Sequence, residues 1–480
     1  MIQLHEIYEV IPIVLIAFAA CAILLIEAFS KESKSVVYGF SIISIMGAIA
    51  TSFLSLNKEV IVFNQFLKIS NASIMFSVII LIGVLITVIA SKNYLEKENI
   101  NFGEFYSLVL FSLMGMMLMV FANDLLIIFI GLELMSVCFY VLAGFLRLRK
   151  KSNESALKYF LLGAFITGFI LYGIALIYGI TGTTNLTRIF ADNKIFSNYV
   201  FIIGYALFLI GFLFKIGVFP FHMWIPDVYD GAPTIVSGML STAGKIAAVG
   251  TVLPIILTVN IVSFKLIFSV AAVATMMYGN IIALAQTNIK RLLAYSSIAS
   301  AGYIFVGVAA MNEFALKGIA YYLIAYTFMQ LGAFIIVSIL EKKDDGSREF
   351  KYVDLDFYKG LGKRNPVLAT FLTIFLFSLA GIPPFAGFWG KYYLFYAAIQ
   401  ANLIWLSVIG ILLSLIGVYY YLKITVYMWF SESTEELMAE YEKVPVSRSG
   451  IFATSLAVIG TIVFGLDPNL FFRIFKMIAE

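Results

Sequence analysis

Apolar residues run along this chain in stretches of roughly 18–25 residues, the length that an α-helix needs to cross the hydrocarbon core of a bilayer. Short polar connections separate these stretches. The segment 59–69 is too short and too polar to span, and it predicts a small hairpin or an interfacial segment. The pattern predicts about fourteen membrane-spanning helices, with cores near residues 10–29, 36–56, 73–91, 104–121, 125–146, 155–180, 199–221, 233–256, 261–285, 291–311, 315–340, 366–396, 402–430 and 449–470.

The composition agrees with a membrane protein. Of the 480 residues, 62% are hydrophobic and only 12% are charged, and the mean hydropathy is +0.99. A water-soluble domain of this size could not bury so much apolar surface, and runs of this length favour helices over a barrel. The predicted fold class is therefore an all-α polytopic membrane protein. The net charge of +4 gives no sign of a nucleic-acid partner.

Residues that hold cofactors are scarce. Cys21 and Cys138 both fall within predicted helices and form no CxxC motif, which excludes an iron–sulfur cluster held by thiolates of this chain. His5 and His222 are too few for a haem or a metal cage. No glycine-rich phosphate-binding motif follows a predicted strand. We expect no cofactor and no metal on this chain.

Lysine and arginine are concentrated in the loops that follow odd-numbered helices, including the charged loop 341–365 and the residues Lys31, Arg348 and Lys443. The positive-inside rule places these loops in the cytoplasm and both termini outside. The loop 341–365 is either a solvated connector or a docking segment for a partner. The first apolar stretch follows acidic rather than basic residues, so we expect a retained helix and not a cleaved signal.

Two of the predicted helices are interrupted by proline within the same motif, Gly-x-x-Pro-Phe, at Gly217–Phe221 and Gly381–Phe385. Proline removes a backbone donor and clashes with the preceding turn, so each helix should break there. The two copies are five helices apart and should run in opposite directions, which is typical of an inverted repeat with discontinuous helices. A chance match is the alternative. The predicted units are 1–103 (helices one to three), 104–256 (first repeat), 257–430 (second, inverted repeat) and 431–480 (C-terminal loop and last helix).

Four ionisable residues, Glu133, Lys215, Lys245 and Lys391, lie inside the apolar stretches. A charge at the bilayer centre costs roughly 2.5–3.5 kcal/mol on insertion scales, and such residues tend to mark ion or proton pathways. Glu133 and Lys215 lie at comparable depth. They form either a structural ion pair that fixes helix packing or a switch whose charges separate. Lys245 and Lys391 have no acid one helical turn away, and a desolvated lysine can exchange its proton near neutral pH. The alternative for these lysines is snorkelling, in which the side chain extends to the membrane interface. For Lys158, near a helix start, both snorkelling and participation in proton transfer remain open.

Three stretches of this chain together resemble a known family: FKIGVFPFHMWIPDVYDGAPT at 214–234, QTNIKRLLAYSSIASAGY at 286–303 and LAGIPPFAGFWGK at 379–391. They are similar to the antiporter-like membrane subunits of proton-translocating NADH–quinone oxidoreductase, respiratory complex I. The helix count, the absence of a long C-terminal lateral helix and the sequence GLELMSVCFY around Glu133 resemble the subunit-N branch most.

The resemblance implies roles for these residues. The family's glutamate in the fifth helix and lysines in the seventh, eighth and twelfth fall on Glu133, Lys215, Lys245 and Lys391, and Lys158 matches a lysine of the sixth helix. Glu133 and Lys215 would form a switch, and Lys245 and Lys391 would carry protons. NADH, FMN, iron–sulfur clusters and quinone would sit on other subunits. The implied partners are the other membrane and peripheral subunits, including neighbouring antiporter-like subunits, within the bacterial inner membrane.

Other functions stay open at this point. A subunit of a multisubunit sodium/proton antiporter would use the same buried residues, and so would a membrane-bound hydrogenase module. A non-transporting scaffold subunit would use the buried charges only to fix helix packing. The scaffold predicts that single substitutions disturb assembly, whereas a proton path predicts assembled complexes in which pumping is impaired.

Overall fold

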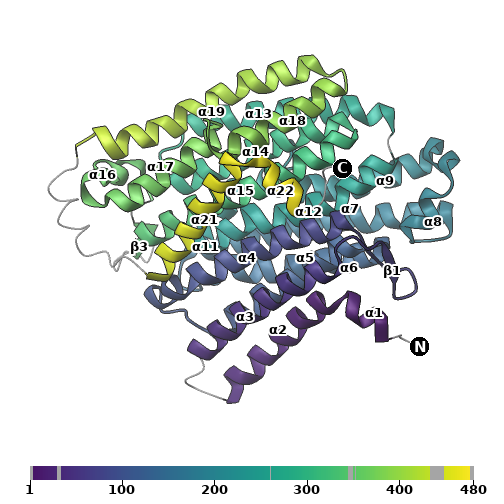
Figure 1. Ribbon diagram of the computed structural model, residues 1–480, viewed down its shortest axis with the longest axis horizontal. Coiled ribbons are helices and arrows are strands. Elements are labelled where there is room, and N and C mark those ends of the chain that lie inside the picture. Colours follow the sequence, from purple (N-terminus) through teal and green to yellow (C-terminus); the bar gives the residue numbers. More distant parts are fainter. Residues whose placement is uncertain are drawn as a thin grey trace.

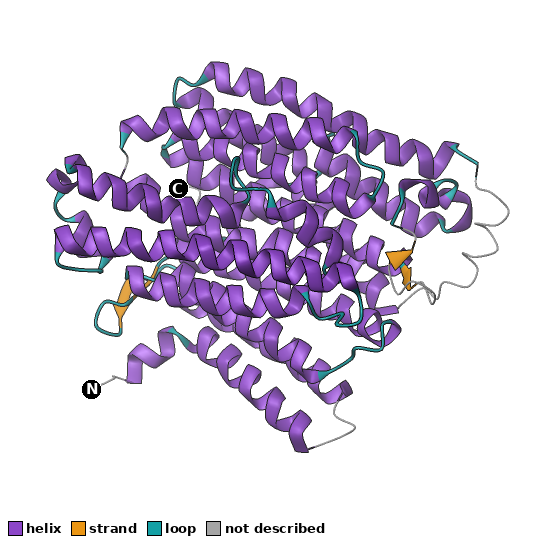
Figure 2. Ribbon diagram, turned by 180° about the vertical axis from the view of Figure 1, so that it is seen from behind, coloured by secondary structure: helices purple, strands orange, loops and turns teal. Residues whose placement is uncertain are grey.

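The computed structural model describes residues 4–29, 34–259, 261–343, 350–351, 353–432 and 448–475. Long helices run side by side along the long axis of the molecule, and their connections lie at its two ends (Figure 1). Two short strand pairs, β1–β2 and β3–β4, lie at opposite ends of this bundle (Figure 2).

The elements follow in chain order. The helices are α1 (Leu4–Glu9), α2 (Ile11–Phe29), α3 (Lys34–Ser52), α4 (Asn71–Lys97), α5 (Gly103–Phe121), α6 (Leu125–Ala143), α7 (Lys150–Thr181), α8 (Leu186–Phe190), α9 (Tyr199–Ile216), α10 (Trp224–Gly231), α11 (Thr234–Met239), α12 (Lys245–Val259), α13 (Val262–Leu284), α14 (Ile289–Ala310), α15 (Glu313–Leu340), α16 (Leu361–Arg364), α17 (Pro366–Ala380), α18 (Ala386–Gln400), α19 (Ile404–Phe430), α21 (Arg448–Leu466) and α22 (Pro468–Ile474). Shorter elements are the 3-10 turns η1 (Phe53–Ser55), η2 (Asn193–Ser197) and η4 (Leu355–Tyr358), the π-helical η3 (Leu240–Gly244), and the strands β1 (Val60–Val62), β2 (Leu67–Ile69), β3 (Lys342–Lys343) and β4 (Phe350–Lys351).

Within the described residues, 13 helices are long and apolar enough to cross a membrane. The broken pair α17 and α18 supplies one further crossing segment, in agreement with the predicted number. The all-α polytopic fold class is therefore confirmed. Of the two alternatives for residues 59–69, the structure has the hairpin, because β1 and β2 pair antiparallel there.

The centre of the bundle is formed by α14 and α15, whose spans are completely covered by the rest of the chain. α2 and α3 lie at one edge and pack on α5 and α4, and α21 packs on α4 and α15. A side chain on α14 or α15 can therefore contact both halves of the chain, whereas one on α2 or α3 cannot. This arrangement determines which buried charges of the two halves can interact with each other.

Both predicted helix breaks are confirmed, and the two breaks have the same geometry. α9 ends at Ile216 and α17 at Ala380, and each is followed by a glycine with φ of 86°, Gly217 and Gly381. An L side chain rarely adopts this left-handed conformation, which explains the glycine of the shared motif. The chain resumes helical structure at Trp224 and Ala386.

A second matched feature supports the predicted repeat. In the first half, the connection before α6 pairs with the connection after α7, with a bridge between Asp124 and Asn185. In the second half, the connection before α14 pairs with the connection after α15, with a bridge between Asn288 and Asp354. Each bridge is flanked by two backbone hydrogen bonds of 2.8–2.9 Å in the same pattern. The inverted repeat and the domain boundaries remain predictions, which this match supports.

Connections that follow odd-numbered spans gather at one end of the bundle. The Arg149 guanidinium pairs with Glu98, and Lys97 Nζ donates to the carbonyl of Glu341. Lys151 pairs with Asp230 at 3.5 Å. These contacts join the ends of α4, α7, α10 and α15 into one polar layer. Lys31, Arg348 and Lys443, and parts of the segments 341–365 and 431–480, lie outside the described residues.

Candidate functional site

The ammonium of Lys215 lies in an aromatic enclosure next to the first helix break. Its Nζ is 5.3 Å from the ring centre of Tyr159 and 5.4 Å from that of Tyr140. Trp224, which follows the break, stacks on Tyr159 at 4.5 Å and donates to the carbonyl of Phe214 at 2.9 Å. Nζ has no hydrogen-bond or ion-pair partner within the described part of the chain. Cation–π contact and the carbonyl end of α9 are therefore the nearest stabilising features.

Glu133 does not form a salt bridge with Lys215 among the described residues. Its Oε1 accepts a hydrogen bond of 2.9 Å from Thr167 Oγ1 on α7. The side chain is only partly buried, and it lies on the face of α6 that carries the exposed residues Ile130 and Val137. The two charges that the sequence places at comparable depth therefore contact other residues and not each other in this structure.

Tyr140 lies between the two charges. It follows Glu133 by about two helical turns on the same face of α6, and its ring contacts Lys215. On α7, Tyr159, Gly163 and Thr167 recur once per helical turn. They face Tyr140 and Glu133 of α6. A Cβ on Gly163 would lie 2.0 Å from the Tyr140 hydroxyl, so glycine is needed there for the ring to fit.

Lys245 is held by a helix of the other half of the chain. Its Nζ donates to the carbonyl oxygen of Ser297 at 2.5 Å and to Ser297 Oγ at 2.8 Å. The side chain is 1% exposed. Lys245 lies about 17 Å from the start of the span Thr234–Val259, close to its middle. Ser297 follows Asn288 as Glu133 follows Asp124, so a serine stands in the second half where the acid stands in the first.

A π-helical turn, η3, precedes Lys245 directly. Single π-helical turns inside longer helices frequently occur at functional sites, because they change the direction of the following side chains. The small residues of this turn allow close packing, since a Cβ on Gly244 would lie 2.8 Å from the ring of Phe139. This turn was not predicted from the sequence, in which the run STAG is the only signal.

Lys391 lies beside the second break and is 6% exposed. Its Nζ donates to the carbonyl of Ala380, the last residue of α17, at 2.9 Å. It also lies 4.8 Å from the ring centre of Tyr303. The free carbonyls at the end of a helix carry partial negative charge, so this position favours a cation.

Two tyrosines of α15 extend from Lys245 toward α18, the helix that carries Lys391. The ring centre of Tyr326 is 5.3 Å from Lys245 Nζ, and Tyr322 stacks on Tyr326 at 6.0 Å. The Tyr322 ring reaches α18, where a Cβ on Gly390 would lie 2.9 Å from it. Gly390 immediately precedes Lys391. Beyond it, Tyr303 and Tyr420 share Asn280 through hydrogen bonds of 3.2 and 3.1 Å.

Lys158 lies apart from this row, at the end of the bundle where the basic loops gather. Its ammonium pairs with Glu154 and Asp227, both at 2.7 Å, and its side chain is 43% exposed. Asp227 also pairs with Arg291 at 3.0 Å, so the cluster joins α7 and α10 to α14. The structure thus brings Lys215, Lys245 and Lys391 into buried positions, leaves Glu133 partly exposed, and places Lys158 at the surface.

Several residues of this site were not singled out from the sequence: Tyr140, Tyr159, Thr167, Ser297, Tyr303 and Tyr326. Ser297 and Tyr303 belong to a run, with Ser300, of polar residues spaced three apart in an apolar helix, and this spacing could have revealed them. Within the part of the chain that the structure describes, no group of three His, Cys, Asp or Glu side chains is placed to hold a metal ion.

Together, the broken helices and the buried lysines define the class of antiporter-like polytopic membrane subunits. The sequence model of the family described as NADH:quinone oxidoreductase/Mrp antiporter, TM, matches residues 122–417. The chain belongs to this family. It is 43% identical to NADH-quinone oxidoreductase subunit N of Trichlorobacter lovleyi over 468 residues, which cover 96% of this chain and 94% of that protein.

Solved structures of similar fold include a chain of respiratory complex I. A chain of respiratory complex I from Thermus thermophilus with bound aureothin matches with a TM-score of 0.81 and 30% identity, covering 96% of this chain and 98% of that chain. A chain of the Mrp complex from Dietzia matches with a TM-score of 0.84 and 19% identity, covering 97% and 96%, and shows the shared fold. The resemblance to subunit N is confirmed, and the chain is a multi-pass protein of the bacterial inner membrane.

The fit between Tyr140 and Gly163 can be tested by Gly163→Ala. The added methyl group would force Tyr140 out of its position, and overpacking of this kind typically costs about 1–3 kcal/mol. We expect a lower melting temperature of the purified protein, followed by intrinsic fluorescence. Gly168→Ala, on the same helix with nothing within 4 Å of its Cβ, is the matched control. Equal melting temperatures for the two variants would show that Gly163 does not admit Tyr140 as described.

Proposed function

We propose that this chain is a proton-translocating, non-redox subunit of a bacterial NADH-quinone oxidoreductase. NADH, FMN, iron–sulfur clusters and quinone belong to other subunits in this proposal, and the chain moves protons in response to their reaction. Three facts support the proposal: the chain belongs to the family, its sequence is 43% identical to a subunit N over 96% of its length, and its buried residues have the chemistry described above.

The observation that carries the proposal is the pair Lys245 and Lys391. Both lysines are buried in membrane-spanning helices, and neither has a carboxylate partner among the described residues. Their ammonium groups are held by carbonyl and hydroxyl oxygens and aromatic rings. Such ligands accept hydrogen bonds from the charged form but carry no full negative charge, so each lysine can release its proton without leaving a buried anion behind.

Protons would pass between the two lysines along the tyrosines of α15. A hydroxyl group both donates and accepts, so Tyr326 and Tyr322 can relay a proton together with water. Ser297 Oγ accepts a hydrogen bond from Lys245 and would take its proton. The Tyr326 hydroxyl has no hydrogen-bond partner among the described residues, so a water molecule would connect it with Ser297. The direction of movement, from the basic-loop side through Lys245 to Lys391 and outward, is part of the proposal.

Glu133 and Lys215 would control this movement as a switch. In the described arrangement Glu133 is bonded to Thr167, and Lys215 is enclosed by rings. Movement of Tyr140 would let the two charges approach each other, which would remove positive charge from the neighbourhood of Lys245. Moving one proton against 100 mV requires about 2.3 kcal/mol, and a close charge pair in a protein supplies energy on this scale.

The partly exposed face of Glu133 indicates where a neighbouring subunit would bind. A carboxylate that faces lipid is costly, whereas one that faces a polar group of another protein is not. We therefore place a neighbouring antiporter-like subunit against α6 and α7. Lys158, in its cluster with Glu154 and Asp227, would lie at the proton-uptake side.

Replacement of the central lysine tests the function. In Lys245→Met the side chain keeps its approximate length but has no proton to exchange, so we expect the complex to assemble and its NADH-driven proton uptake into inverted membrane vesicles to be abolished. Assembly is followed by native gel electrophoresis of the complex. The control is Lys317→Met, in the first turns of α15, which should pump normally. Loss of assembly together with activity would favour the scaffold function instead.

Removal of one hydroxyl tests the connection between the lysines. Tyr326→Phe keeps the ring over Lys245 and removes only the hydroxyl. One hydrogen bond contributes about 0.5–1.5 kcal/mol, so the pumping rate should fall about twofold to tenfold. Tyr419→Phe, on the exposed face of α19, is the matched control. If the two variants pump equally fast in the same vesicles, the proton does not pass Tyr326.

A further inference from the structure

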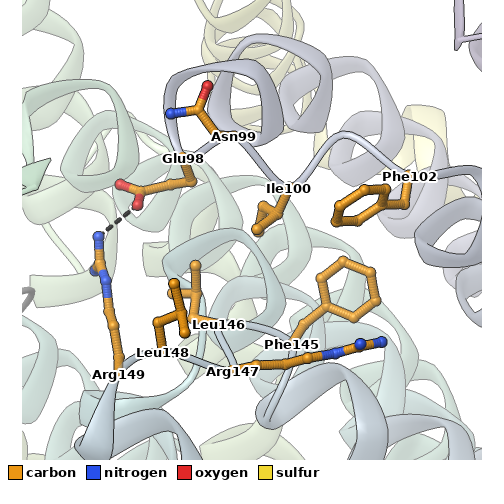
Figure 3. A pocket seen from close by; sticks show the side chains of 9 residues that line it. All are labelled: Glu98, Asn99, Ile100, Phe102, Phe145, Leu146, Arg147, Leu148 and Arg149. Carbon is orange, nitrogen blue, oxygen red and sulfur yellow. Dashed lines mark hydrogen bonds and ion pairs between the residues drawn. The ribbon is translucent and has the colours of Figure 1, made fainter.

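A pocket separate from the lysine row opens at the end of the bundle where the basic loops gather. Its volume is about 280 Å³. Two connections form it: residues 98–102, which join α4 to α5, and residues 145–149, which join α6 to α7 (Figure 3). Four membrane-spanning helices therefore begin or end at this pocket, which places it at the depth of the lipid head groups.

The wall of the pocket is largely apolar. Ile100, Phe102, Phe145, Leu146 and Leu148 contribute to it. Leu148 is 71% exposed and Phe102 is 47% exposed, although both lie in connections rather than on a membrane-facing helix. Large apolar side chains exposed together at an interface indicate contact with something apolar outside the chain.

The polar groups of the pocket carry both signs of charge. At the left of Figure 3, Glu98 pairs with Arg149, and both side chains are buried. The second carboxylate oxygen, Glu98 Oε1, is buried and has no hydrogen-bond partner among the described residues. Burial raises the pKa of Glu98, and Arg149 opposes this shift. Arg147 lines the pocket, is exposed and supplies positive charge.

We propose that this pocket binds one phospholipid of the cytoplasmic leaflet. The phosphate would pair with Arg147, and a head-group amine or hydroxyl would donate to Glu98 Oε1. The first part of one acyl chain would lie on Leu146, Phe145 and Leu148.

The chemistry favours this occupant over other amphiphiles. Basic pockets at the cytoplasmic ends of membrane helices suit phosphate head groups, and the apolar wall suits a chain. The volume, about 280 Å³, lies just below the usual range of ligand pockets, about 300–1,000 Å³, so only part of a chain fits and the rest continues into the bilayer. A bound lipid would tie the α4–α5 connection to the α6–α7 connection, and so fix the ends of the helices that carry Glu133 and its partner Thr167.

Photo-crosslinking in the assembled complex tests the proposal. A diazirine amino acid replaces Leu148, the membranes are illuminated, and the adducts on this chain are identified by mass spectrometry. We expect a phospholipid adduct, and its mass distinguishes an amine head group from a hydroxyl head group. The same probe at Phe430, which is 81% exposed at the end of α19, is the control and should give a severalfold lower yield.

Other results would overturn the proposal. An adduct with a neighbouring protein subunit would show that the pocket is a subunit interface, and equal lipid yields at the two positions would show only bulk lipid. The head-group contact is tested separately by Arg147→Gln, which should lower the adduct yield at Leu148 severalfold. Lys363→Gln, an exposed cation of α16, should leave the yield unchanged. An unchanged yield with Arg147→Gln would exclude the phosphate contact.

Discussion

The organisation of this protein depends on how it holds an ammonium group in a low-dielectric interior without a carboxylate beside it. An isolated buried ion is very unfavourable, and a buried ion pair is stable but does not readily give up its proton. The chain uses an intermediate solution. Ser297 and Ala380 offer oxygen acceptors to Lys245 and Lys391, and tyrosine rings offer their electron-rich faces.

The broken helices provide much of this environment. A continuous helix uses all its interior carbonyls, but a helix that ends within the membrane leaves its last carbonyls free. At Gly381 the chain turns away, and the carbonyl of Ala380 becomes available to Lys391. At Gly217 the equivalent end of α9 lies beside Lys215. The glycine–proline motif thus creates an acceptor for a cation inside the bundle.

Much of the fold could be predicted from the sequence. The apolar runs predicted the spans, and the motif around Pro220 and Pro384 predicted both breaks, because proline and glycine act locally on the backbone. Rotation of each helix could not be predicted. α6 is apolar all round, so its pattern does not distinguish the face of Glu133 from the buried face, and the contact with Thr167 depends on how α7 packs against it.

The candidate site was predictable only in part, for the same reason. Lys215, Lys245 and Lys391 stand out because charges are rare in apolar runs, whereas tyrosine and serine are common there and draw attention only when their neighbours are known. Ser297 is a clear case: its role comes from Lys245, which lies far away in the sequence. Likewise, the surface position of Lys158 follows from Asp227, which the break at Pro220 brings to it.

The most direct measurement of the central claim is the proton-to-electron ratio of the assembled complex carrying Lys245→Arg, in vesicles where NADH oxidation and proton uptake are followed together. Arginine keeps the positive charge, but it does not release its proton in proteins. If Lys245 carries protons, the complex assembles and the ratio falls below that of the unmodified complex. An unchanged ratio would mean that only the charge at this position matters, and it would contradict the account.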